Sequence, residues 1–265
     1  MTVQLTRTVR FCLGADGVAG RDAAASNTFA AWPPMRGLGR YYELHVTCTG
    51  PVDAATGYFI NVTRIDEAVR SRAIDLIVQA SGQPDQAEAL GLLMRRLLEA
   101  LQAPLDGSVR SLTLQLTPTY ALRIEDTSMG QVHMSQQYEF SAAHRLHAAD
   151  LSDQDNRRVF GKCNNPSGHG HNYRFEVTVR CDVDETGRIA AVEQLDDLVS
   201  RTVIERLDHK HLNLDVAEFA HLNPSVENIA MVIFDLLKAP LEQAHLALDQ
   251  VRVWETAKTV CTYRG

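Results

Sequence analysis

Residues 161–179 read GKCNNPSGHGHNYRFEVTV, and this stretch decides the fold of the second half of the chain. Apolar side chains fall at every second position from Tyr173 to Val179, which predicts a β-strand with one buried face. His169 and His171 continue that face, so their imidazoles project together from the start of the strand. The glycines between and before them leave room for a bulky group. The stretch therefore predicts a strand that presents two metal-ligating or catalytic side chains.

A second alternating segment lies upstream, where residues 136–147 read QQYEFSAAHRLH. His144 shares its face with Tyr138, Phe140 and Ala142. If this strand pairs with the first one, it brings a third imidazole near the other two. Three neutral imidazoles on rigid strands suit Zn²⁺ and leave a fourth position open for a substrate oxygen. The alternative is that all three are ordinary buried or surface histidines.

Three further groups are candidates for chemistry. Cys163 precedes the histidine pair in a loop of turn-forming residues, where it could be a fourth metal ligand, a free thiol, or a general base or nucleophile. Asp208 and His209, in RLDHKHLNLD, could form a proton relay, or simply follow a helix C-terminus. Glu255, in QVRVWETAKT, is either buried and paired, aimed at a ligand's donor groups, or exposed at a hairpin end.

The composition describes an ordinary globular protein of 265 residues with a net charge of −7. This acidic balance argues against a general nucleic-acid partner. The N-terminal residues contain no long apolar run, which argues against a signal peptide and against a membrane span. Five scattered cysteines show no disulfide spacing, so we expect a reduced, cytoplasmic protein.

The two halves of the chain read alike, which indicates a tandem duplication. Each half predicts strand, strand, helix, helix, strand, strand. In the second half the helices are expected at Val192–Leu207 and Ser225–Leu237, with Ser225 as N-cap. We expect an N-terminal unit over 1–128 and a catalytic unit over 132–265. Nearly all histidines lie in the second half, so the first unit is expected to carry no metal or catalytic motif.

Several motifs in the second half resemble one family. They are FSAAHRLHAADLSDQDNRRVFGKCNNPSGHGHNY, LDHKHLN, NPSVENIA and VRVWET, in that order. Together they resemble the 6-pyruvoyl-tetrahydropterin synthases and the related 6-carboxytetrahydropterin synthases of the queuosine pathway. The resemblance covers about half of the chain, and the first half resembles a diverged copy of the same fold.

The resemblance implies an α+β tunnelling fold, in which four-stranded antiparallel sheets with two helices each assemble into a barrel. It implies a lyase that releases triphosphate from 7,8-dihydroneopterin triphosphate in tetrahydrobiopterin biosynthesis; the carboxy-forming reaction and a non-catalytic pterin-binding module are the alternatives. The expected partners are therefore this small molecule and further copies of the chain, as a trimer of two-unit chains. The implied roles are Zn²⁺ ligation by His144, His169 and His171; catalysis by Cys163, Asp208 and His209; and substrate binding by Glu255, Ser225 and Glu227.

Overall fold

The computed structural model describes residues 1–14, 27–35, 37–81 and 89–265. It divides into two compact units, which are described one at a time. The N-terminal unit comprises Met1–Met134 with Cys181–Ile189, and the C-terminal unit comprises Ser135–Arg180 with Ala190–Gly265. In the part of the chain that is described, no helix is both long and apolar enough to cross a membrane.

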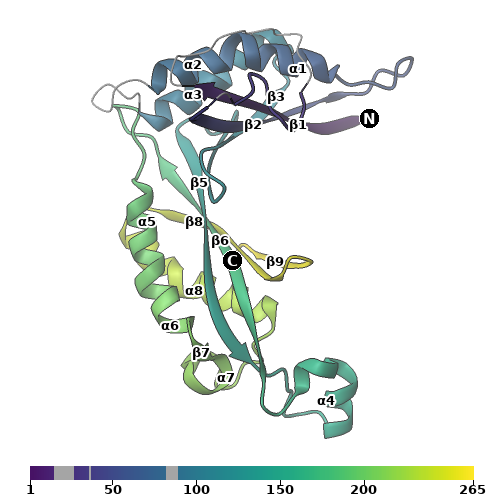
Figure 1. Ribbon diagram of the computed structural model, residues 1–265, viewed down its shortest axis with the longest axis vertical. Helices are drawn as coiled ribbons and strands as arrows, with labels where there is room; N and C mark the ends of the chain where they lie inside the picture. Colours follow the sequence, from purple (N-terminus) through teal and green to yellow (C-terminus); the bar gives the residue numbers. More distant parts are fainter. Residues whose placement is uncertain (15–26, 36, 82–88) are drawn as a thin grey trace. The chain divides into compact units, whose positions relative to one another are not determined.

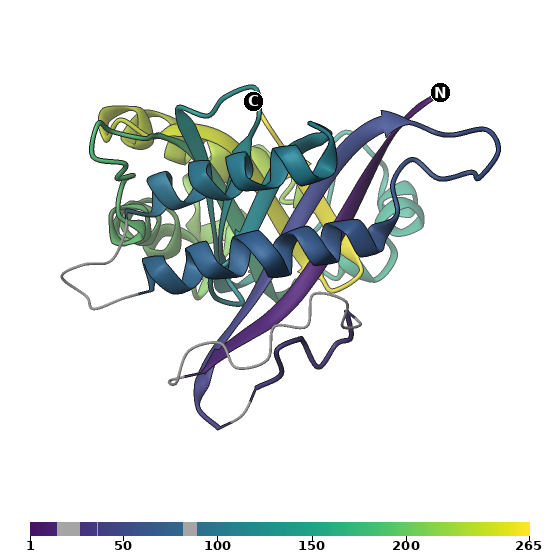
Figure 2. The same cartoon turned by 90° about the horizontal axis from the view of Figure 1, so that it is seen from above.

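The N-terminal unit is an antiparallel sheet with helices packed on one face (Figure 1). Its strands follow the order β1 (Thr2–Gly14), β2 (Gly39–Pro51), β3 (Val109–Gln115) and β4 (Tyr120–Glu125). Its helices are α1 (Val62–Ala68) and α2 (Ile74–Ala80), joined by a π-helical turn, and α3 (Leu90–Gln102). Figure 2 shows the two helical segments side by side across the strands.

Alternation along β1 and β2 explains why the helices cover only one face of this sheet. Val9 and Phe11 of β1 and Leu44 of β2 are fully buried on the helical side. Leu97 of α3, equally buried, lies on the helix that packs against β3 and β4 of the same sheet. The intervening residues are polar and point to the uncovered face.

The C-terminal unit has the same architecture. Its strands follow the order β5 (Gln131–His144), β6 (His169–Asp182), β8 (Ala247–Thr256) and β9 (Thr259–Tyr263), and the short β7 (Lys210–His211) runs parallel to β5 on its other side. Its longer helices are α4 (Asp153–Phe160), α5 (Val192–Val199) and α8 (Val226–Gln243), and its shorter ones are α6 (Glu205–Leu207) and α7 (Leu212–Asp215). The predicted pairing of β5 with β6 is confirmed.

Most of the helix predictions hold. A π-helical turn joins α5 to α6, so helical structure covers the predicted range 192–207. The hydroxyl of Ser225 caps α8 by accepting the amide N–H of Asn228. The predicted end of this helix at Leu237 was wrong, because α8 continues through Pro240 and buries Leu241 on the face that carries Leu237.

Helix α4 was not predicted. Its start signal is nevertheless present in the sequence, because the Ser152 hydroxyl caps it by accepting the amide N–H of Asp155. The helix carries only one buried residue, Asn156, so it has no apolar stripe for a pattern search to find.

Candidate active site

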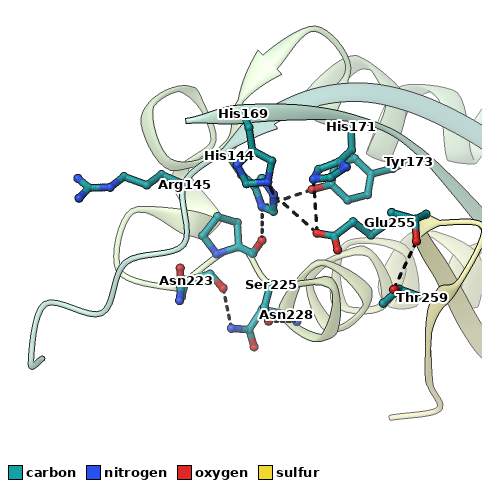
Figure 3. A network of polar contacts seen from close by, with 12 residues as sticks. His144, Arg145, His169, His171, Tyr173, Asn223, Ser225, Asn228, Glu255 and Thr259 are labelled. Carbon is teal, nitrogen blue, oxygen red and sulfur yellow. Dashed lines mark hydrogen bonds and ion pairs between the residues drawn. The ribbon is translucent and has the colours of Figure 1, made fainter. Parts of the chain in front are cut away.

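Three imidazoles meet where β5 ends and β6 begins (Figure 3). One ring nitrogen from each of His144, His169 and His171 lies within 4.8 Å of the others. The Nε2 atoms of His144 and His169 are 3.1 Å apart. A tetrahedral ion with Zn–N bonds of about 2.0–2.1 Å holds two ligand nitrogens roughly 3.3 Å apart. The spacing of the imidazoles therefore fits a metal ion.

Hydrogen bonds and burial give these rings features that suit a metal ion. The Nδ1 of His144 donates to the carbonyl oxygen of Pro224 at 2.7 Å, which leaves Nε2 as a ligand atom. Within the described ranges, the buried Nδ1 of His169 and Nε2 of His171 have no hydrogen-bond partner. Burial lowers the pKa of His144 to about 4, although the Pro224 hydrogen bond acts in the opposite direction. Buried ring nitrogens without a hydrogen-bond partner, gathered from three imidazoles, are groups that a bound cation would satisfy.

Glu255 of β8 points toward the imidazoles (Figure 3). Its Oε1 lies 3.7 Å from the Nε2 of His144 and 3.8 Å from the Nε2 of His171. The Glu255 side chain retains 20% exposure, so it is neither fully buried nor free in water. The sequence left three environments open for Glu255: buried and paired, aimed at a ligand, or exposed at a hairpin end. The structure favours the second, a carboxylate that faces the interior of the site.

The ring of Tyr173 packs edge-on against the rings of His144 and His171. Its ring is fully buried and stacks on Phe140 at a centroid distance of 5.0 Å. Its hydroxyl lies 3.3 Å from the Nδ1 of His144. Burial, and then the charge of Glu255, raise the pKa of the Tyr173 phenol, which therefore stays protonated. From the sequence, Tyr173 was assigned only to the apolar face of the strand. Its position beside the site could have been predicted, because it has the same parity on the strand as His169 and His171.

The start of α8 lies against the same imidazoles. Ser225 follows Pro224, whose carbonyl holds His144, and the amide of Asn228 donates to the carbonyl of Asn223 at 2.7 Å. Glu227 is exposed in the first turn of the helix. Its charge raises the pKa of Cys261, after the larger effect of burial. The structure thus places Ser225 next to Pro224, the residue that holds His144 of the candidate metal site, while the Glu227 side chain is exposed.

Cys163 lies in a half-buried 3-10 turn, Gly161–Asn164, between α4 and β6. Its carbonyl accepts the amide N–H of Leu146 at 2.9 Å, which ties the turn to the segment after His144. Gly168 then brings the chain into β6 with a φ of +72°. A Cβ at that position would stand only 3.0 Å from the carbonyl oxygen of His144. The turn therefore packs closely against the site, and Gly168 makes this possible.

Asp208 and His209 form a pair beside β5. The Oδ1 of Asp208 accepts the amide N–H of Ser141 at 2.8 Å, and its Oδ2 lies 2.7 Å from the Nδ1 of His209. The Ser141 amide and then His209 lower the pKa of Asp208. The backbone of His209 is left-handed, with φ +56°, and its side chain is 83% exposed. A fixed carboxylate–imidazole pair with its ring in solvent can exchange protons with a group supplied from outside.

A cavity of about 590 Å³ adjoins this pair. Its lining includes His171 and Gly170 of β6 together with the segment His209–His211. His211 brings a further imidazole whose buried Nδ1 has no hydrogen-bond partner among the residues described. In the sequence, the pattern HKH at residues 209–211 could have predicted that His211 lies on the same side as His209. The cavity thus connects His171, of the candidate metal site, with the Asp208–His209 pair.

The C-terminal unit is similar to proteins of known function. A family model for 6-pyruvoyl tetrahydropterin synthase matches residues 133–265. The 6-pyruvoyl tetrahydrobiopterin synthase of Drosophila melanogaster is 45% identical over 127 residues, which cover 48% of this chain and 75% of that protein. The protein of the same name from Homo sapiens is 40% identical over 136 residues, covering 51% of this chain and 92% of that one. The solved structure of Caenorhabditis elegans 6-pyruvoyl tetrahydropterin synthase is 40% identical, covers 51% of this chain and 96% of that chain, and has a TM-score of 0.48.

Proposed function

The chain belongs to the 6-pyruvoyl tetrahydropterin synthase family, and we propose that its C-terminal unit converts 7,8-dihydroneopterin triphosphate to 6-pyruvoyl-tetrahydropterin. The reaction eliminates triphosphate and makes the chain a carbon–oxygen lyase. The observation that carries the proposal is the group of three imidazoles, whose ring nitrogens lie within 4.8 Å of one another beside Glu255. Identity of 40–45% to relatives named for this activity supports the same reaction.

We infer that His144, His169 and His171 hold Zn²⁺. Imidazole nitrogens suit this ion, and three protein ligands are the number that leaves a position open in catalytic zinc sites. When bound, the ion supplies Lewis-acid polarisation of a side-chain oxygen of the substrate, which makes the adjacent C–H more acidic. The carbonyl of Pro224 keeps the ring of His144 in the tautomer that ligation needs.

The remaining residues bind the substrate and move its protons. Glu255 accepts hydrogen bonds from the N–H groups of the pterin and fixes its orientation, and the segment with Ser225 and Glu227 lines the ring pocket. The Cys163 thiolate takes a proton from a side-chain carbon of the substrate, and triphosphate leaves with its electron pair. No external oxidant or reductant is required, because the rest of the conversion is an internal rearrangement.

Asp208 and His209 return protons to the substrate side chain. Their geometry suits this role, because Ser141 holds Asp208 and Asp208 in turn holds the ring of His209. The 83% exposure of His209 also suits an active site that is completed by a neighbouring chain, to which His209 is presented from outside.

The N-terminal unit is proposed as a structural partner. We infer that it arose by duplication, lost the metal and catalytic motifs, and contributes a tunnelling-fold sheet to a closed barrel. The shared order of strands and helices in the two units supports this origin. If six units close the assembly, three two-unit chains provide them, which gives a trimer.

The test is to incubate the zinc-loaded protein with 7,8-dihydroneopterin triphosphate and identify the products by mass. We expect the pyruvoyl product and free triphosphate, and we expect the Cys163→Ala variant to form neither while keeping its zinc. Cys261→Ala is a matched control, because this cysteine is also half-buried in the same unit but lies on β9. A carboxylated product accompanied by acetaldehyde would assign the chain to the carboxy-forming branch instead.

A further inference from the structure

The N-terminal unit contains a cavity of about 520 Å³ on the sheet face that its helices leave uncovered. It is lined by side chains from β2 and by the end of β3 with the turn that follows: Tyr41, Glu43, His45, Gln115, Leu116, Thr117 and Pro118. We propose that this cavity binds a flat, uncharged nitrogen heterocycle that carries an amino group, of the aminopyrimidine type. The proposal does not depend on the function of the C-terminal unit.

Glu43 is the main recognition group, because it is held in place and has acceptor capacity left. Its Oε1 accepts hydrogen bonds from the Nε of Arg10 at 2.9 Å and from the hydroxyl of Tyr41 at 2.6 Å. Its Oε2 faces the Nε2 of His45 at 3.6 Å, a distance too long for a hydrogen bond. A ligand N–H can therefore bind at Oε2 without displacing the groups that hold Glu43.

The charges of Glu43 and Arg10, on the side of the cavity formed by β2, cancel. Burial alone raises the pKa of Glu43, but the hydrogen bonds from Tyr41 and Arg10 outweigh it and lower the pKa overall, so Glu43 is ionised. Burial lowers the pKa of His45, which is therefore neutral at pH 7. The negative charge of Glu43 is balanced by Arg10 at 2.9 Å. A wall without net charge favours an uncharged ligand, because a cation would meet Arg10 and an anion would meet Glu43.

His45 itself is fixed in orientation. Its Nδ1 lies 2.9 Å from the hydroxyl of Thr8 on β1, the strand that pairs with β2. The ring therefore forms a rigid polar edge beside Glu43 and is not free to rotate into the cavity.

Gln115 provides a second acceptor on the neighbouring strand β3, where it is the register partner of Glu43. Its amide nitrogen donates to the carbonyl oxygens of Thr117 at 2.6 Å and Tyr120 at 3.1 Å, so both amide hydrogens are used. Its Oε1 remains as an acceptor, and the same two bonds fix the turn that closes the cavity. The ring of Tyr41, which is 41% exposed, and the side chains of Leu116 and Pro118 supply apolar surface. Acceptors combined with apolar walls select a flat ring that carries N–H groups.

The experiment uses the full chain with the substitution Glu255→Gln, which removes the carboxylate proposed to bind a pterin in the C-terminal unit. Binding of 2-aminopyrimidine is measured by saturation-transfer NMR at pH 7.5 and compared with binding of pyrimidine, which has no N–H donor. We expect 2-aminopyrimidine to bind about tenfold or more tightly than pyrimidine, the effect of hydrogen bonds to a charged acceptor.

Two variants test the assignment to this cavity. Glu43→Gln is expected to weaken 2-aminopyrimidine binding about tenfold or more. Gln115→Leu leaves the Arg10–Glu43 pair intact and is expected to weaken 2-aminopyrimidine binding as well. This variant therefore tests the assignment to the cavity if Glu43→Gln does not fold. Glu176→Gln is the matched control, because Glu176 also pairs with an arginine, Arg252, at 3.4 Å, but in the other unit. Equal binding of the two probes, or unchanged binding to folded Glu43→Gln or Gln115→Leu protein, would overturn the proposal.

Discussion

Replacing Gly168 by alanine is expected to damage the candidate metal site although residue 168 is not a ligand. Two costs can be worked out from the structure. The φ of +72° is left-handed, and a residue with a Cβ pays roughly 1–2 kcal/mol there. The new Cβ would also stand 2.8 Å from the Nε2 of His211 and 3.0 Å from the carbonyl oxygen of His144. Because the second atom belongs to the backbone of β5, it cannot rotate away, and overpacking of this kind costs about 1–3 kcal/mol.

Two glycines of the same segment are matched controls. Gly161 also has a positive φ, +53°, with ψ −123°, but a Cβ there would meet nothing within 4 Å, so Gly161→Ala has a backbone cost without a contact cost. Gly170 lies between the two β6 histidines, and a Cβ there would meet only the carbonyl oxygen of Ala142 at an ordinary 3.5 Å. We expect losses of about 2–5 kcal/mol for Gly168→Ala, about 1–2 for Gly161→Ala and less than about 1 for Gly170→Ala.

The assay is urea unfolding of the chelated protein, followed by zinc titration against a chromophoric chelator. Gly168→Ala should also weaken zinc binding about 10–100-fold, the usual effect of disturbing the groups that orient metal ligands. If Gly168→Ala costs no more than Gly161→Ala and binds zinc like the unsubstituted protein, the turn does not pack against His144 as described.

Three further predictions concern the same unit. Ser225→Ala removes the cap that accepts the Asn228 amide and should destabilise α8 by about 0.5–2 kcal/mol in urea unfolding, whereas an unchanged midpoint would show that the cap contributes nothing. In the protein freed of metal by a chelator, the pKa of His144 is about 4 in the folded chain, against an ordinary value of 6.5. Between these values the unfolded chain binds more protons than the folded one. The free energy of unfolding should therefore fall by about 2 kcal/mol from pH 7 to pH 5. His144→Gln should show a smaller loss, and equal pH profiles would contradict the burial of a neutral ring. Asp208→Asn removes the charge that orients His209 and should lower kcat while zinc content, measured by elemental analysis, stays at the level of the unsubstituted protein; loss of zinc would instead indicate a structural role.

Local patterns in the sequence predicted most of the fold of the C-terminal unit. Alternation gave the buried faces of β5 and β6, because a strand places every second residue on one side. The same parity brought His144 onto the face of His169 and His171 once the two strands paired. Helix α4 was missed because it has no apolar stripe, and the end of α8 was misplaced because burial of Leu241 outweighs the usual effect of Pro240.

Contacts between distant segments could not be predicted in this way. The Pro224 carbonyl that orients His144 lies on the loop before α8, and no spacing rule links the two residues. The anchoring of Asp208 by the Ser141 amide likewise depends on how the segment after α6 runs beside β5. The cavity beside Glu43 was missed because no single motif marks it; it needs β1, β2 and the β3–β4 turn together.

The most direct test of the proposed zinc-dependent reaction is to titrate Zn²⁺ into the chelated full chain while measuring triphosphate release from 7,8-dihydroneopterin triphosphate. The account predicts that release rises with zinc and levels off at about one ion per chain, since one unit of each chain carries the three imidazoles. His169→Ala, which removes a predicted ligand, should show neither binding nor release. Release that is independent of zinc, or that persists at full rate in His169→Ala, would contradict the account.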